Sequence, residues 1–359
     1  MLGIETSCDE TAAAVVRGGE VIESSIVASQ EDLHARFGGI VPEVASRKHV
    51  ELLTVVVDEA LRQPRVEWED LSAIAVTHGP GLVGSLIVGV AAAKAYAMSS
   101  DLPLVGVNHL EAHVHASMLH EPGEVSPFAA SGADFPLACL VASGGHCDLL
   151  RVPRLGEYAL LGCARDDAPG EAFDKAARLL GLGYPGGPAI ERAAAEGDAG
   201  KVELPRPLVK DSLDFSFSGL KTALVRLLER QESGARSQES GKAAGWKPAP
   251  QTVAGLAAGF QAAVVEVLVR NTMEAINQVS ARGVVLSGGV AANTLLRETM
   301  AKEAARRGVP FAVAPRSLCT DNAAMVAAAG YHVLQRRGAD GLDLDVFSTL
   351  PLGSVKRDQ

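Results

Sequence analysis

Two histidines four residues apart, His109 and His113, have the types and spacing best suited to chemistry in this chain. They follow a run of small and apolar residues, 104–107, which predicts the end of a buried strand. Asn108 is a typical helix N-cap, and Glu111 stands three places later, as in a capping box. A helix that begins at His109 would place both imidazoles on one face. Such a pair is suited to a transition metal, and the site needs at least one further ligand.

Several strand ends carry turns that are rich in glycine. Residues 143–146, Ser-Gly-Gly-His, lie between predicted strands, and the two glycines allow the backbone to approach a ligand closely. Residues 78–85 open a helix whose N-terminus is able to receive an anion. They lack the lysine of a Walker loop, so a tight strand-to-helix turn is an equal interpretation.

The first turn, residues 5–11, carries hydroxyls and carboxylates, among them Asp9 and Glu10. Taken alone, it is best interpreted as a solvated hairpin.

Periodicity places the elements that must position these residues. Strands are predicted at 2–6, 12–16, 21–28, 74–77, 104–107, 137–141, 147–152, 283–286 and 311–314. Helices are predicted at 45–63 (with residues 50, 53, 57, 60 and 61 on its inner face), 86–98, 109 onward, 171–180, 254–276, from about 293, and through 334 after Asp321. Residues 121–135 and 230–251 are predicted as loops, the second of them flexible, and residues 181–188 as a helix stop.

Composition bounds the class of protein. The chain has 359 residues, enough for two cores, with 47% hydrophobic and 21% charged residues, which is ordinary for a soluble globular protein. No apolar run reaches the roughly 18 residues of a membrane span, and the start shows no secretion signal. Five scattered cysteines without a CxxC pair favour a reducing cytoplasm. A net charge of −10 means that a nucleic-acid partner would need a local basic patch or a helper protein.

A series of long motifs occurs in order along almost the whole chain. These are residues 3–11, 108–113, 143–146, 170–175, 184–188, 214–222, 287–293 and 319–322. The series resembles the TsaD family, tRNA N6-adenosine threonylcarbamoyltransferases. Three features depart from the family pattern: alanine and cysteine stand at 112 and 147 in place of the usual glycine and threonine, the loop 230–251 is longer, and the first strand begins abruptly.

The resemblance implies an α/β fold of the actin, sugar-kinase and heat-shock-chaperone type, with two lobes and a nucleotide site in the cleft between them. We expect residues 1–115 to form the first lobe, completed by a C-terminal helix at about 320–340. Residues 116–319 would form the second lobe and include the flexible loop.

The resemblance also implies that Asp321 joins His109 and His113 to hold one divalent metal ion per subunit. A carboxylate and two imidazoles suit iron(II) and zinc(II) equally, so the sequence does not choose between them. Each residue has a plainer interpretation when taken alone, the histidines as a satisfied pair and Asp321 as a helix N-terminal acid. Cys319 is a rival ligand, whereas His115 would face elsewhere.

An adenine nucleotide is expected as part of the substrate, threonylcarbamoyl-adenylate. By resemblance it would lie against Val141, Ala142, Ser143, Gly144, Gly145, Asp174, Gly187 and Asn293. Backbone N–H groups of residues 143–145 would hold the phosphate, and Asp174 would accept hydrogen bonds from the ribose. Without the resemblance, Asp174 would be interpreted as an exposed acid paired with Lys175 or Arg178.

The implied reaction is attack by N6 of adenosine 37, in tRNAs that read codons beginning with A, on the carbonyl of the activated donor, with release of AMP. Asp9 and Glu10 would orient the amine or accept its proton. Partners implied by the family are tRNA and TsaB-like and TsaE-like proteins, with no membrane. Candidate tRNA-binding residues are 46–49, Lys210, Lys221 and 306–307, each of which also fits a solvated helix face.

Three other functions are considered. A zinc protease requires His-Glu-x-x-His, but Glu111 stands two places after His109, roughly 200° around the helix from it. A small-molecule kinase or ATPase of the same superfamily would turn over ATP without tRNA. A non-enzymatic scaffold is disfavoured by the joint presence of His109, His113 and Asp321.

Overall fold

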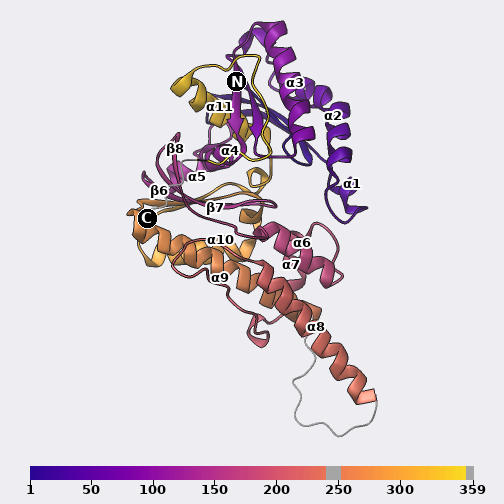
Figure 1. Ribbon diagram of the computed structural model, residues 1–359. Helices are drawn as coiled ribbons and strands as arrows, with labels where there is room; N and C mark the ends of the chain where they lie inside the picture. The colour runs from indigo at the N-terminus through magenta and orange to yellow at the C-terminus, as the bar shows by residue number, and fades with distance from the viewer. Residues whose placement is uncertain (240–251, 353–359) are drawn as a thin grey trace.

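The computed structural model describes residues 1–239 and 252–352, which form two α/β units (Figure 1). Each unit is a five-stranded sheet with the helices that pack on it, and is called a layer below. The first sheet has the strand order β3-β2-β1-β4-β5 and the second has the order β10-β9-β6-β7-β8. The first consists of β1 (Leu2–Glu5), β2 (Glu10–Arg17), β3 (Val21–Ser29), β4 (Ile74–Gly79) and β5 (Leu104–Asn108). The second consists of β6 (Leu137–Ala142), β7 (Cys147–Arg154), β8 (Glu157–Cys163), β9 (Gly283–Ser287) and β10 (Phe311–Val313). In both sheets, antiparallel hairpin strands are followed by parallel strands, so the two layers share one plan.

Helices cover both faces of the first sheet. Helices α2 (Pro42–Arg62) and α3 (Val83–Ser100) pack on one face, and α11 (Ala323–Arg337) packs on the other against β1, β2, β4 and β5. Alternate residues of β2 serve the two faces: Ala13 and Val15 join the cluster that contains Leu53, whereas Ala14 and Val16 join the cluster with α11. The end of the chain therefore completes the core of the first layer.

The second sheet carries the remaining long helices. These are α6 (Pro169–Leu179), α7 (Gly186–Ala194), α8 (Ser218–Glu239), α9 (Val253–Val279) and α10 (Thr294–Arg306). Helix α9 packs on β6 and β7 and is mostly buried. Short helices are α1 (Glu31–Ala35), α5 (Pro127–Ser131) and the 3-10 turns Trp68–Asp70, Ala116–Met118, Ala199–Lys201, Gly289–Ala292 and Arg316–Leu318.

Helix α4 (His109–His115) connects the two layers. It contacts β4 and β5 of the first sheet, β6 and β9 of the second, and α11. Every residue of this helix is buried. Side chains on α4 are therefore held by both sheets at once.

The predicted strands and long helices are confirmed, with boundary shifts of a few residues. Strand β8 and helix α7 were not predicted, and the predicted loop 121–135 contains α5. Residues 230–239 are helical in α8 rather than a loop, because good helix formers extend a helix already begun. The rest of that predicted loop, 240–251, lies outside the described residues. Val50 was expected on the inner face of α2 but is 67% exposed, because His49 takes the inward position.

Two helices, α3 and α9, are long and apolar enough to cross a membrane by length and composition, where the sequence analysis expected none. In α9, 72% of the most apolar window is buried inside the molecule, and α3 packs on β4 and α2. Helices that cover sheets in a globular layer meet the same criterion, so this is weak evidence for a span. The lobe boundaries near residues 115 and 319 stay a prediction.

Candidate metal centre and its surroundings

The helix that carries the two histidines begins as the sequence predicts, with one difference. The Asn108 side-chain oxygen accepts hydrogen bonds from the backbone N–H groups of Leu110 (2.9 Å) and Glu111 (3.3 Å), so the N-cap is confirmed. The capping box is wrong, because the Glu111 carboxylate instead accepts hydrogen bonds from Tyr158 (3.1 Å) and Arg336 (3.3 Å). A guanidinium and a phenol hydroxyl thus form charge-assisted hydrogen bonds with this carboxylate in place of the backbone N–H of a capping box. Tyr158 and Arg336 therefore hold the Glu111 carboxylate, which would have to act as the general base in a zinc protease.

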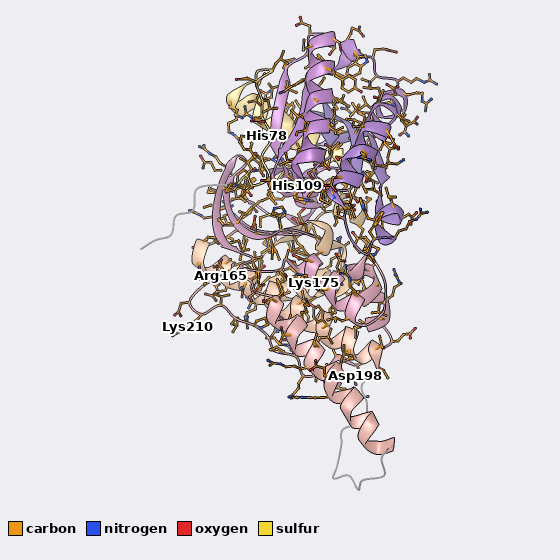
Figure 2. All side chains as sticks on the ribbon, turned by 45° about the vertical axis from the view of Figure 1, so that its right-hand side comes forward. His78, His109, Arg165, Lys175, Asp198 and Lys210 are labelled. Atoms are coloured by element: carbon orange, nitrogen blue, oxygen red, sulfur yellow. The ribbon has the colours of Figure 1, made fainter. Side chains whose placement is uncertain are left out.

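His109, His113 and Asp321 come together between the two layers; Figure 2 shows His109 at this level of the molecule. Asp321 Oδ1 lies 3.4 Å from His109 Nε2 and 3.2 Å from His113 Nε2. One ligand atom from each residue lies within 4.8 Å of the others. Asp321 precedes α11, whereas the histidines precede the whole second layer in sequence, so the fold brings distant segments to one point.

His113 shows that this group fits a metal ion. Its side chain is fully buried, and neither ring nitrogen has a hydrogen-bond partner among the described residues. The 3.2 Å approach to Asp321 lacks the direction of a hydrogen bond. A buried, unsatisfied nitrogen costs about 1–3 kcal/mol. Coordination of a divalent cation by this nitrogen would remove that cost.

Glu5 supports His109 from behind, and the sequence analysis gave it no role. This carboxylate is fully buried at the end of β1. Its Oε2 accepts a hydrogen bond from Thr77 Oγ1 (2.6 Å) and lies 3.1 Å from His109 Nδ1. A proton on Nδ1, donated to Glu5, leaves Nε2 free to face Asp321.

Charges in the centre are strongly coupled. Burial would raise the pKa of Asp321, but the positive charge of His109 and the close approach of both imidazole Nε2 atoms outweigh it and lower that pKa. Burial likewise opposes protonation of His109, and Asp321 and Glu5 outweigh it and raise the pKa of His109. For His113 burial dominates, and its pKa is lowered. A divalent cation at this position would take the place of the proton that the two carboxylates favour on His109.

The two other candidate ligands lie outside this group. The Cys319 thiol contacts Arg297 and the Ala314 carbonyl, each at 3.5 Å. His115 stacks on His332, with ring centroids 4.9 Å apart. Neither belongs to the cluster of His109, His113 and Asp321.

Asp9 lies in the turn between β1 and β2, Glu10 is the first residue of β2, and both are partly exposed. Burial, followed by the negative charges of Asp9 and Asp321, raises the pKa of Glu10 well above its usual value. Ser29 Oγ lies 3.5 Å from the Glu10 carboxylate. The negative charge of Glu10 therefore interacts with that of Asp321 in the candidate metal-ligand group.

The turn after β6 comes from the second layer. Ser143 N–H donates to the His146 carbonyl (2.8 Å), so it is not a free phosphate donor as the sequence analysis expected. Gly144 and Gly145 are exposed, and a Cβ on either would meet nothing within 4 Å. Val141 and Ala142 are buried at the end of β6. A ligand can therefore approach the backbone of this turn at Gly144 and Gly145.

His146 ends the motif 143–146, but its sequence context predicts no role for it. Burial, followed by the charges of His109 and His113, lowers its pKa to about 4. The second layer therefore contributes an imidazole that interacts electrostatically with the metal-ligand group.

The other expected nucleotide contacts also belong to the second layer. Asp174 Oδ1 accepts a hydrogen bond from Gly186 N–H (2.7 Å), and burial raises its pKa. Lys175 pairs with Asp167 and Glu171, so the alternative pairing of Asp174 with Lys175 is wrong.

Gly187 and Asn293 lie at two helix starts of this layer. Gly187, in the first turn of α7, has open space at its Cβ position. The Asn293 side chain caps α10 and donates to Gln261, so both its polar atoms are engaged within the protein.

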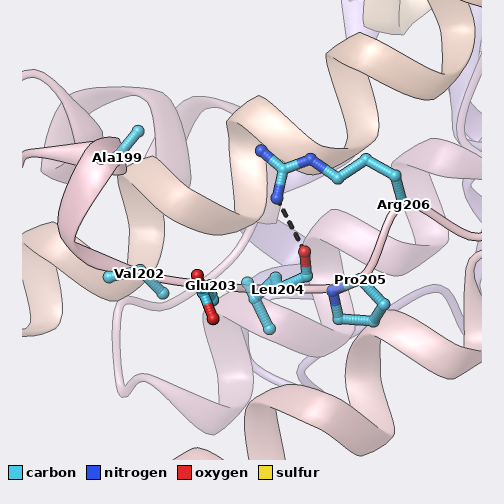
Figure 3. A pocket seen from close by; sticks show the side chains of 7 residues that line it. Ala199, Val202, Glu203, Leu204, Pro205 and Arg206 are labelled. Carbon is cyan, nitrogen blue, oxygen red and sulfur yellow. Dashed lines mark hydrogen bonds between the residues drawn. The ribbon is translucent and has the colours of Figure 1, made fainter.

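Three of the candidate tRNA-binding residues are ion-paired and a fourth is buried. His49 is fully buried and cannot contact RNA, Lys48 pairs with Glu51, and Arg306 and Arg307 both pair with Glu303. A surface hollow at residues 199–206 lies apart from the site residues described above, and within it Arg206 donates to the Leu204 carbonyl at 2.7 Å (Figure 3).

Two matching α/β layers with a connecting helix define the class as the two-lobed actin, sugar-kinase and heat-shock-chaperone fold. Among solved structures, HypF from T. kodakarensis matches with a TM-score of 0.58 at 16% identity, covering 94% of this chain and 48% of that one. A full-length HypF in a phosphate- and nucleotide-bound form gives a TM-score of 0.56 at 14% identity, covering 94% and 47%. These likenesses confirm the fold alone.

The family follows from closer relatives. The model of the TsaD family, tRNA N6-adenosine threonylcarbamoyltransferase, matches residues 21–328. Curated proteins of that name from Thermomicrobium roseum and Symbiobacterium thermophilum are 52% and 50% identical over 358 and 353 residues. The alignments cover 98% of this chain in both cases and 96% and 97% of the relatives. The chain belongs to the TsaD family.

Proposed function

We propose that this protein transfers the threonylcarbamoyl group from threonylcarbamoyl-adenylate to N6 of adenosine 37 in tRNAs that read codons beginning with A, releasing AMP. Membership of the TsaD family over nearly the whole chain carries this proposal. The reaction is an acyl transfer from an activated donor, so the protein's task is positioning and charge stabilisation. The kinase and ATPase alternative is not favoured by the relatives.

The first layer supplies the reacting groups. His109, His113 and Asp321 would hold one iron(II) or zinc(II) ion, which when bound supplies a Lewis acid for the donor's carbonyl oxygen. Glu5 orients His109 through its Nδ1. Glu10, whose pKa is raised by burial, would accept the proton that N6 loses as its bond to the carbonyl carbon forms, and Asp9 would orient the amine. The bond between that carbon and the phosphate oxygen then breaks, and AMP leaves.

The second layer would hold the adenylate. Gly144 and Gly145 leave room for its phosphate against the backbone after β6. Asp174 uses one oxygen to hold the start of α7, which leaves the other for ribose hydroxyls. Gly187 leaves room for the nucleotide at the first turn of α7, and Asn293 shapes the wall by fixing α10.

A TsaB-like protein would bind the outer face of α2 and α3, with a TsaE-like protein as a further component. Large apolar side chains are exposed on these adjacent helices: Val50 and Val55 on α2, and Val83, Ile87 and Met98 on α3. Exposed apolar patches of this kind are typical of protein interfaces. A partner would also supply positive surface for tRNA, which this acidic chain lacks overall. Action on tRNA would favour a cytoplasmic location for the protein.

The proposal is tested by the mass of anticodon-loop fragments from tRNA incubated with this protein, its partners and the activated donor. We expect the fragment to gain one threonylcarbamoyl group. Steady ATP hydrolysis without tRNA, together with an unchanged fragment mass, would instead support the kinase alternative.

The partner surface is tested by Ile87→Glu, with Val125→Glu, also on an exposed apolar residue, as the matched control. Ile87→Glu should abolish co-purification with the TsaB-like protein, and the control should not. Equal co-purification of both variants would reject the surface.

A further inference from the structure

The turn that carries Asp9 and Glu10 is held by an imidazole to which the sequence analysis gave a different role. We propose that His49 is a positioning residue that fixes residues 8–11 and thereby aims the two acids. This inference rests on the proposed function, because it matters for transfer only if Asp9 and Glu10 act on the amine.

His49 contacts both ends of the turn. It projects inward from α2 and is fully buried. Its Nε2 lies 3.0 Å from the Cys8 carbonyl oxygen, and its Nδ1 lies 2.8 Å from Thr11 Oγ1. A carbonyl can only accept, so Nε2 carries the proton and Nδ1 accepts a hydrogen bond from the Thr11 hydroxyl. One rigid ring thus spans the two residues that flank Asp9 and Glu10.

Burial keeps this arrangement in one protonation state. Desolvation lowers the pKa of His49, and the hydrogen bond to the Cys8 carbonyl opposes it. The neutral ring has one donor and one acceptor, which match its two partners. Gln30 Nε2 approaches the same Nδ1 at 3.5 Å and also faces the Ala45 carbonyl at 3.4 Å, which closes the network around the ring.

The other short contacts of the turn and of Ser7 before it include two made by backbone groups. Leu82 N–H donates to the Ser7 carbonyl (2.9 Å), and Gln30 N–H donates to the Asp9 carbonyl (3.1 Å). The Cys8 carbonyl has, besides His49, only a longer contact from Ser85 Oγ at 3.5 Å among the described residues. Removal of the imidazole therefore leaves the Cys8 peptide plane with a weak partner and frees the Thr11 hydroxyl.

Removal of His49 is expected to misplace the carboxylates of Asp9 and Glu10 without weakening the binding of donor or metal. Displacing a reacting group by about 1 Å can cost on the order of 100-fold in rate. Within the part of the chain that the structure describes, His49 forms no hydrogen bond or ion pair with the candidate ligands His109, His113 and Asp321, and the proposed nucleotide wall comes from the other layer. Replacement of His49 should therefore lower the rate of transfer while leaving metal content and donor affinity unchanged.

The test compares His49→Leu with His49→Gln, and Thr11→Val with Thr11→Ser, in the full chain with its partners. Leucine fills the space without polar atoms, whereas glutamine supplies an NH2 donor and an oxygen acceptor. Valine removes the hydroxyl that serine retains. Readouts are the single-turnover rate of transfer to tRNA, donor affinity, metal content and thermal unfolding.

We expect His49→Leu to lower the transfer rate about 100-fold with unchanged donor affinity and metal content. His49→Gln should recover most of the rate, and Thr11→Val should be slower than Thr11→Ser. If His49→Leu fails to fold, the Thr11 pair decides the matter. Wild-type rates in both His49→Leu and Thr11→Val would overturn the inference, as would equal rates for His49→Leu and His49→Gln.

The acid variants Asp9→Asn and Glu10→Gln separate this outcome from failure of the proposed function. If both acid variants transfer at the wild-type rate, the proposed role of Asp9 and Glu10 is wrong. The proposed role of His49 is then wrong as well, because it depends on theirs. If they are slow while the His49 and Thr11 variants are not, only the role of His49 is wrong.

Discussion

The two layers contribute to the site in opposite ways. The first presents buried side chains that hold one another: Glu5 lies against His109, and His109 and His113 lie against Asp321. The second presents mainly backbone and open space, with Gly144 and Gly145 exposed and nothing near their Cβ positions. Polar groups of the first layer are preorganised before any substrate arrives, whereas the second layer leaves room for one.

Under the proposed function, this difference would separate chemistry from binding in the molecule. Charge stabilisation requires groups that do not reorganise during the reaction, and buried, mutually bonded side chains meet that requirement. A nucleotide needs concave space and a few donors, which glycine turns and helix starts provide. Substitutions in the first layer should therefore affect metal content and rate, and substitutions in the second should affect donor affinity.

The largest effect is expected for His113→Ala. It removes a ligand whose two nitrogens have no other use among the described residues, so bound metal and transfer should both fall more than about 100-fold. Metal content is measured by elemental analysis and transfer by tRNA fragment mass. His120→Ala, which changes a histidine outside the centre, should leave both unchanged. Full metal occupancy in His113→Ala would contradict the assignment.

Gly145→Val tests the opposite wall. The added side chain meets no protein atom within 4 Å of its Cβ, so folding should be unaffected while the donor loses its space. We expect donor affinity to fall at least about tenfold, a cost of about 1.4 kcal/mol, with metal content unchanged. Gly219→Val is the matched control, because Gly219 also has open space at its Cβ position. Equal donor affinity in both variants would remove residue 145 from the nucleotide wall.

Glu5→Gln tests whether the carboxylate behind His109 contributes to metal binding. The amide retains the size of the carboxylate but loses the charge that orients and polarises His109. Loss of such a partner typically lowers metal affinity about 10–100-fold, and excess metal should restore transfer. Metal titration followed by the transfer assay measures both quantities. A variant that stays slow at saturating metal would show that Glu5 acts on something other than metal binding.

The smallest effect compares two carboxylates, one in each layer. Imidazoles lower the pKa of Asp321, whereas burial alone raises the pKa of Asp148 on β7 from 3.8 to about 6. Between these two pH values the folded protein keeps the Asp148 proton that the unfolded chain loses, so the free energy of unfolding falls as pH rises through this window.

Asp148→Asn should therefore be more stable than wild type at pH 7, by about 1–2 kcal/mol after allowance for partial exposure, and equal to it near pH 4. Urea unfolding at the two pH values measures this difference. A stability difference that does not change with pH would show that Asp148 has a charged partner.

Local sequence rules predicted the parts of the site that depend on one segment. The i, i+4 spacing of His109 and His113, the Asn108 cap and the glycine turn after β6 are of this kind. Glu5, His146 and His49 required the strand order, because their partners lie on other elements. The capping box failed for the same reason, since Arg336 is 225 residues away from Glu111 in sequence.

The position of α11 has a consequence for synthesis on the ribosome. A nascent chain that has emerged through β10 contains every described strand of both sheets, yet it lacks Asp321 and the helix that covers one face of the first sheet. Strands β1 and β2 are translated first, but one face of their sheet stays uncovered until α11 has been translated. A product that terminates just before Asp321 would lack one of the three candidate ligands as well as the helix that covers this face.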